Sequence, residues 1–305
     1  RRLAYESGKL PGDIVTATYF LNVDHKLPIV SITSDPYYID SDAAGIYAFG
    51  DDYSREYPFP GANFNQDWEV PAYVEMYEID GSQVLNQGTG LRIFGAYSRA
   101  EIAKSFTLVA RPEFGAEVLD HAIFPDQPFE SYKSVILRNG ASVWYTNKIV
   151  DTTLTSLVRD TTDLATQSFY PAVVYINGKY WGVYFFREKL NKYFLEYRYG
   201  MDPENVDIIY GNGTSTRNAL AGDNTDWLAL KNYVETHDLS NPDNYAVVEN
   251  WVDIQNYIDY VICEIYVGNT DTGNIKQYRE KTEGGKWRWM YYDVDWSFVN
   301  SHLTD

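Results

Sequence analysis

The chain has 305 residues, of which 45% are hydrophobic, so it is long enough to bury a large core as one elaborate domain or two packed lobes. Its formal net charge of -18 argues against nucleic acid as a partner, because phosphate backbones need a basic surface. The single cysteine excludes internal disulfides and cysteine-rich zinc sites, and no apolar run is long enough to span a membrane.

The first half of the chain is predicted to consist mainly of β-strands. Short apolar or alternating runs indicate strands at residues 27–32, 70–77, 90–94, 104–110 and 134–140. The stretch 50–67 is rich in Gly, Pro and Asp, which favours a long irregular segment. Apolar residues at helical spacing then predict a helix over about 146–160. Asn177-Gly178, between two apolar runs, predicts a β-hairpin over 172–186.

The second half is predicted to be mainly helical, with helices over 188–197, 225–236 and 253–267. The last of these has Asp253 as a natural N-cap. Its predicted apolar face consists of Ile254, Tyr257, Ile258, Val261 and Ile265. Two strands, over 275–280 and 286–293, then form a terminal hairpin. We therefore expect an α+β protein of one domain over 1–305, with a β-rich lobe over 25–187 and a mainly helical lobe over 188–305.

Three carboxylates near the end of the chain are the strongest candidates for chemistry. Asp293 and Asp295 end an aromatic run that indicates a buried strand, and Asp271 precedes the hairpin that leads to them. Burying acids is costly unless a positive charge is near, and a metal ion with oxygen ligands would supply one. Together with Asn274, this arrangement suits a phosphotransferase, in which one Asp orients or deprotonates a hydroxyl while an Asn and a second Asp hold divalent ions. The alternative is that these residues only form turns and helix caps.

A nucleotide also needs cations, and three basic residues in the first lobe are candidates. Arg99 and Lys104 follow a glycine-containing turn, where they could grip phosphates. Glu188 could pair with Lys104 and hold it in place, or it could sit at a helix N-terminus. Arg138, at a strand end, is a candidate of the same type as Arg99. The alternative for Lys104 is a surface lysine at the end of a strand.

Five segments together resemble the spore-coat protein H (CotH-type) kinase family, over about residues 27–298. These segments are residues 95–106, Leu137-Arg138-Asn139-Gly140, the hairpin 171–184 with Arg187-Glu188-Lys189, Asn269-Thr270-Asp271-Thr272-Gly273-Asn274-Ile275-Lys276, and the aromatic strand 286–296 that contains Asp293-Val294-Asp295-Trp296.

The resemblance implies an atypical protein-kinase-like fold, with ATP and Mg²⁺ (or Mn²⁺ or Ca²⁺) as cofactors. It also implies phosphate transfer to Ser or Thr of secreted or surface proteins, and hence an extracellular or cell-surface location, although no signal peptide is visible. On this basis Asp271 matches the catalytic aspartate, Asp293 and Asn274 match metal ligands, and Lys104 and Glu188 match the phosphate-gripping lysine and its acidic partner. Asp295 would be a further metal ligand, or an acid that supports the ligands or caps an element without binding the metal.

Two other functions fit the sequence. The pair Asp293 and Asp295 would also suit a nucleotide-sugar glycosyltransferase, which holds a divalent ion with an Asp-x-Asp motif. The many aromatic residues would suit a non-catalytic carbohydrate-binding or adhesion module in which the acids hold structural Ca²⁺.

Overall fold

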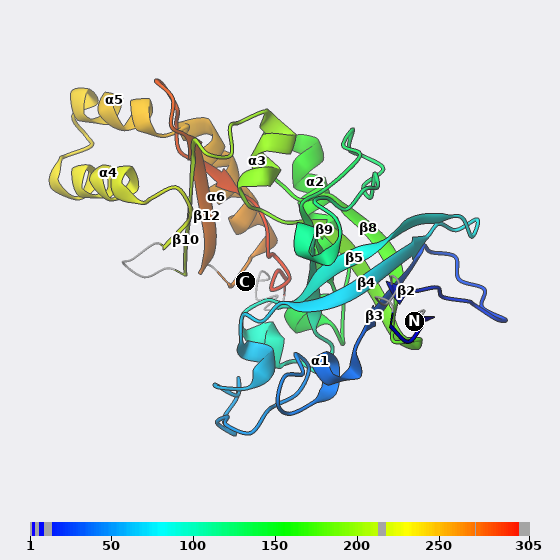
Figure 1. Ribbon diagram of the computed structural model, residues 1–305. Coiled ribbons are helices and arrows are strands. Elements are labelled where there is room, and N and C mark those ends of the chain that lie inside the picture. Colours follow the sequence, from blue (N-terminus) through cyan, green and yellow to red (C-terminus); the bar gives the residue numbers. More distant parts are fainter. Residues whose placement is uncertain (1, 4–5, 9–13, 213–217, 272, 299–305) are drawn as a thin grey trace. The chain divides into compact units, whose positions relative to one another are not determined.

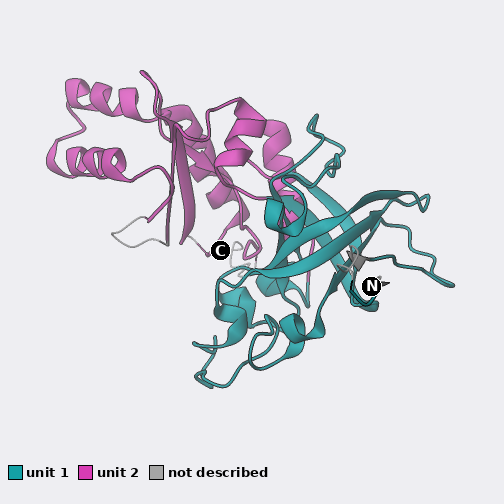
Figure 2. Ribbon diagram, viewed as in Figure 1, with its two compact units in different colours: residues 1–146, 168–188 teal, residues 147–167, 189–305 magenta. Residues whose placement is uncertain are grey.

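The chain forms two compact units, each of which is described here by itself (Figure 1, Figure 2). The computed structural model describes residues 2–3, 6–8, 14–212, 218–271 and 273–298. Unit 1 comprises Arg1–Thr146 and Ser168–Glu188, and unit 2 comprises Asn147–Gln167 and Lys189–Asp305. Within the described parts of the chain, no helix is both long enough and apolar enough to cross a membrane.

Unit 1 is built on a closed β-barrel. In order around the barrel, its strands are β3 (Ile29–Ser34), β4 (Val70–Tyr77), β5 (Gln83–Phe94), β6 (Ser105–Val109), β7 (Ser134–Arg138), β9 (Lys179–Glu188) and β8 (Phe169–Ile176). Neighbouring strands are antiparallel, except that β3 and β8 run parallel and close the barrel with Ile29 opposite Val173. The barrel buries alternate apolar side chains such as Val30, Ile32 and Val74, as the period of two in a strand requires.

Short elements complete unit 1. They are β1 (Arg2–Leu3), which pairs with β2 (Ile14–Val15), the helix α1 (Pro36–Asp40), and the 3-10 turns η1 (Asn63–Asn65), η2 (Tyr97–Ala100), η3 (Pro112–Phe114) and η4 (Ala141–Val143). The predicted hairpin of β8 and β9 is present, and Asn177-Gly178 makes its turn with both residues at positive φ.

Unit 2 combines a four-stranded antiparallel sheet with helices. Its helices are α2 (Val150–Thr161), α3 (Lys192–Tyr199), α4 (Thr225–Thr236), α5 (Pro242–Trp251) and α6 (Ile254–Val267). Its sheet has the order β11 (Asn218–Ala221), β10 (Val206–Asn212), β12 (Asn274–Glu280) and β13 (Arg288–Met290). An aromatic core that includes Trp287, Trp289 and Tyr291 packs with apolar residues of α2 and of α4 to α6.

α6 leads the chain into the loop that carries Asp271. Its N-cap is Asp253, as predicted, and the Asp253 side chain accepts a hydrogen bond from the backbone N–H of Asn256. The predicted apolar face is largely wrong, because Tyr257, Ile258 and Ile265 are exposed. The buried residues of α6 are Asn256, Tyr260 and Val267. One buried position of this helix is therefore occupied by a polar side chain, that of Asn256.

The predicted fold class is wrong. The structure has a closed seven-stranded barrel and a second sheet, with six α-helices among the described residues, rather than an atypical protein-kinase-like fold with a mainly helical C-terminal lobe. One physical reason is β10, a strand missed in the sequence, which pairs with β12 along its whole length and makes the C-terminal hairpin part of a larger sheet. The other is the pairing of β3 with β8, which joins residues far apart in sequence.

We predict that Asn256→Ala lowers the stability of unit 2. Asn256 is buried, and its Oδ1 accepts the backbone N–H of Trp289 at 2.7 Å, which ties α6 to β13. Leaving that N–H without an acceptor costs about 1–3 kcal/mol. Urea unfolding measures the loss, with Gln255→Ala on the exposed side of the same helix as the control. Equal stability of the two variants would contradict the role of Asn256.

Candidate functional site

The loop after α6 is held by the side chain of Asn269. α6 ends at Val267, and Gly268 adopts the left-handed conformation (φ +58°) that lets the chain leave the helix. Asn269 Nδ2 donates to Glu264 Oε2 at 2.8 Å, and Asn269 Oδ1 accepts the backbone N–H of Asp271 at 3.1 Å. One side chain therefore fixes Asp271 relative to the last turn of α6.

The hairpin that follows brings Asp293 to Asp271. β12 begins at Asn274, and its antiparallel partner β13 leads the chain towards Asp293. Asn274 Nδ2 donates to Asp271 Oδ2 at 2.8 Å and to Asp293 Oδ2 at 2.9 Å. Because an amide nitrogen has two N–H groups, these two bonds use both of them. A single amide thus joins two carboxylates that are distant in sequence.

The two carboxylates make this site electrostatically negative. Partial burial and the nearby charge of Asp293 raise the pKa of Asp271 above its ordinary value. Tyr210, within β10, donates its hydroxyl to Asn274 Oδ1 at 3.2 Å. Burial, followed by the charges of Asp293 and Asp271, raises the pKa of Tyr210 as well. Burial is the first cause of both pKa shifts, and the charge of the neighbouring acids is the second.

One positive side chain lies beside this group. Lys276 Nζ lies 4.4 Å from the ring centroid of Tyr292 and 5.9 Å from that of Tyr210, within the range of cation–π attraction. Burial is the largest cause that raises the pKa of Tyr292, and the charge of Asp293 is the next. The phenol of Tyr292 therefore stays neutral beside the acids.

The oxygen atoms at this site would suit a hard divalent cation that keeps water or phosphate oxygens as its other ligands. Within the described ranges, no group of three or more His, Cys, Asp or Glu side chains is arranged to hold a metal ion. Asp271 and Asp293 offer two carboxylates close together, whereas Asn274 presents its N–H groups to them and its Oδ1 to Tyr210, so its oxygen could bind a cation only after the amide turned. Mg²⁺ is usually bound by one or two carboxylates, with water and substrate phosphates as the other ligands. The residues therefore suit Mg²⁺ better than a metal that needs a cage of protein ligands.

The amide of Asn274 does not donate to Asp295. Asp295 is buried two residues beyond Asp293, and both N–H groups of Asn274 already serve Asp271 and Asp293. Hydrogen bonds of this amide therefore join three of the four acid and amide residues that the sequence singled out.

Lys104 in unit 1 is buried in its own loop, just before β6. Its Nζ donates to the backbone carbonyls of Arg99 at 2.6 Å and Glu101 at 2.9 Å, and lies 3.9 Å from the ring centroid of Phe64. Burial lowers the pKa of Lys104 to about 8. The loop therefore already supplies two acceptors for this ammonium group, and its role as a phosphate clamp stays a prediction.

Arg99 also bonds to protein acceptors in unit 1. Its guanidinium donates to the backbone carbonyls of Gly95, Asn65 and Gln66 and to the carboxylate of Asp67. These bonds tie η2 to the segment after η1. Arg138 is buried in β7, opposite Phe185 of β9. Phosphate binding by either arginine stays a prediction.

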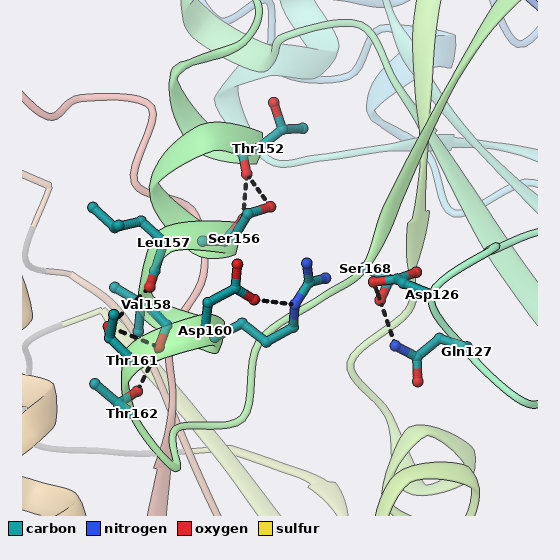
Figure 3. Close-up of polar contacts among 12 residues, drawn as sticks. Asp126, Gln127, Thr152, Ser156, Leu157, Val158, Asp160, Thr161, Thr162 and Ser168 are labelled. Carbon is teal, nitrogen blue, oxygen red and sulfur yellow. Dashed lines mark hydrogen bonds and ion pairs between the residues drawn. The ribbon is translucent and has the colours of Figure 1, made fainter.

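Glu188 lies at the end of β9, and not at the start of a helix. The helix predicted over 188–197 is α3, which begins at Lys192 with Asn191 as its N-cap. Glu188 Oε2 accepts the backbone N–H of Ser168 at 2.8 Å. Ser168 Oγ in turn donates to Asp126 Oδ2 at 2.8 Å and receives a bond from the Gln127 side chain (Figure 3).

Asn139, in the Arg-Asn-Gly turn after β7, holds the segment around Lys104. Its Oδ1 accepts from Ser105 Oγ at 2.7 Å, and its Nδ2 donates to the carbonyl of Ala103. The residues on both sides of Lys104 are therefore bound to one buried asparagine. The sequence placed Asn139 in a motif, but nothing in the sequence gave it this structural role.

Tyr210 and Asn269 were not predicted as residues of the site. Tyr210 lies within the strand that was not predicted, so its approach to Asn274 could not be foreseen. Asn269 follows a helix and a glycine, a position typical of a loop residue, and its two hydrogen bonds depend on the path of that loop.

We predict that Asp271→Asn raises the melting temperature of the metal-free protein. The variant removes one of two repelling carboxylates, and its amide oxygen can still accept from Asn274. Because the folded-state pKa of Asp271 is raised, ionisation costs stability at neutral pH, and this cost disappears as the pH falls below the ordinary value. Calorimetry in chelator at neutral and acidic pH measures the difference, with Asp259→Asn as the control. A lower melting temperature at neutral pH would contradict the repulsion.

A search of curated proteins found no match to the chain. A family model described as CotH kinase protein matches residues 91–303, a range that contains every candidate site residue discussed above. The match covers more than half of the chain and both acids that Asn274 joins. The chain therefore belongs to the CotH kinase protein family.

Proposed function

We propose that this protein is a divalent-metal-dependent phosphotransferase that uses ATP and acts on Ser or Thr hydroxyls of secreted or surface proteins. The observation that carries this proposal is the bridge from Asn274 to Asp271 and Asp293. It brings together the residue types that phosphate transfer needs. The family membership supports a kinase-like function in general. ATP, the protein acceptor and the extracellular location rest on the resemblance of the motifs.

The proposed roles divide between the two carboxylates. Asp293 and Asn274 would hold Mg²⁺ or Mn²⁺, which supplies neutralisation of the phosphate charges when it is bound. Asp271 would orient the acceptor hydroxyl and take its proton. The hydroxyl oxygen forms a bond to the γ-phosphorus, the bond from that phosphorus to the bridging oxygen breaks, and ADP leaves with the electron pair. The bond from Asn269 to the backbone of Asp271 keeps the proton acceptor in place.

The geometry favours this function over a glycosyltransferase. An Asp-x-Asp enzyme would hold its cation with Asp293 and Asp295, whereas here the amide of Asn274 pairs Asp293 with Asp271. Asp295→Asn tests the difference, because it removes a ligand only in the Asp-x-Asp arrangement.

We predict that ATP binds in the presence of Mn²⁺ and that Asp293→Ala weakens this binding at least tenfold, because the cation loses a carboxylate. Asp271→Asn should keep ATP binding but lower phosphate transfer by about 10²–10⁴-fold, because the proton acceptor is gone. Isothermal titration measures binding, and transfer of label from [γ-³²P]ATP to the chain itself and to dephosphorylated casein measures turnover.

Asp243→Ala, on the exposed first turn of α5, is the control for loss of one negative charge. ATP binding that survives both a chelator and Asp293→Ala would remove the metal site from the proposal. Full turnover by Asp271→Asn would remove Asp271 from the role of base. Binding of a UDP-sugar in place of ATP, with loss in Asp295→Asn, would favour the glycosyltransferase.

A further inference from the structure

In the turn after β13, the backbone of Asp293 has an unusual conformation. Asp293 adopts φ +61°, in the left-handed region that non-glycine residues rarely occupy. Asp tolerates this region better than most residues, but such a conformation persists only where the surroundings hold it. The next residue, Val294, is fully buried, so its backbone N–H needs an acceptor from the protein.

Asp151 supplies that acceptor from a distant part of the sequence. It lies in the first turn of α2 and is 3% exposed, and its Oδ1 accepts the backbone N–H of Val294 at 3.1 Å. A carboxylate is favoured in the first turn of a helix, and a hydrogen bond to a charged acceptor is stronger than one to a neutral group. The bond therefore has both an anchored acceptor and a buried donor.

Several side-chain hydroxyls of α2 and its C-cap bond to the backbone carbonyls of the helix. Ser156, Thr161 and Thr162 each donate to the backbone carbonyl four residues earlier, as Figure 3 shows for the middle and end of the helix. Thr155 Oγ1 does the same to the carbonyl of Asp151. The carboxylate of Asp151 is thus presented from a helix with its own polar contacts satisfied, and not from a loop.

We propose that Asp151 is the positioning residue of Asp293. By fixing the N–H of Val294, it holds the peptide that follows Asp293 and so keeps the carboxylate of Asp293 within reach of Asn274. Its effect on metal binding rests on the proposed function, whereas its effect on the turn does not. Asp151 acts here as a hydrogen-bond acceptor, so its geometry matters more than its negative charge.

Three variants separate geometry from charge. Asp151→Asn keeps an oxygen at the same position but removes the charge. Asp151→Glu keeps the charge but displaces the oxygen by one methylene group, and Asp151→Ala removes both. Asp160→Ala, at an exposed position of the same helix, is the control.

The first measurement is amide hydrogen exchange at Val294, which does not depend on any metal. We expect protection to be kept in Asp151→Asn and in the control, and to be lost by at least tenfold in Asp151→Glu and Asp151→Ala. The second measurement is titration with Mn²⁺ alone, where the same two variants should bind about 10–100-fold more weakly than wild type, the usual cost of removing a group that orients a ligand. If Asp151→Ala does not fold, the comparison of Asp151→Asn with Asp151→Glu still tests the proposal.

Unchanged protection of Val294 in Asp151→Glu and Asp151→Ala would overturn the proposal. So would Mn²⁺ binding that is lost in Asp151→Asn but kept in Asp151→Glu, because that result would make charge the decisive property. If wild type binds no Mn²⁺ but the pattern of protection appears as expected, the proposed function fails while the role of Asp151 in the turn stands.

Discussion

Two carboxylates held close to one another are the constraint around which the end of this chain is organised. Asp271 and Asp293 repel each other, and partial burial weakens the solvation that would otherwise reduce the repulsion. The amide of Asn274 offsets part of this cost by donating one N–H to each. An arrangement of this kind lowers stability unless a cation completes it, and functional sites commonly carry such a cost.

The surrounding elements of unit 2 each hold one part of that arrangement. Asn269 fixes the backbone at Asp271, and Tyr210 of β10 donates to the oxygen of the Asn274 amide. Asp151 on α2 accepts the backbone N–H of Val294, the residue after Asp293. The bond from Asn256 to Trp289 ties α6 to β13, the two elements that lead to the acids. The site is therefore built from one hairpin but oriented by three other elements.

Local patterns in the sequence were enough to predict that Asp271, Asn274 and Asp293 lie close together, but not the fold that holds them. The hairpin of β12 and β13 and the helix α6 have strong local signals, so the approach of Asp293 to Asp271 could be foreseen. β10 could not, because its apolar run is short and includes Asp207, whose buried carboxylate is paired with Arg279 and Lys281 from another strand. Closure of the barrel by β3 and β8 depends on pairing between distant residues, which periodicity does not report. Asn256, on the buried face of α6, shows the same limit. Its contribution to stability comes from a hydrogen bond with Trp289 of β13, a partner that the local pattern does not reveal.

The account depends on a cation at the group formed by Asp271, Asn274 and Asp293. The most direct test is anomalous diffraction from crystals of the protein grown with Mn²⁺ and a non-hydrolysable ATP analogue. The account predicts an anomalous peak within coordination distance of Asp293 and Asn274, next to the phosphates of the analogue. Crystals in which the analogue is bound and Mn²⁺ lies elsewhere, with Asn274 still donating to both carboxylates, would contradict it.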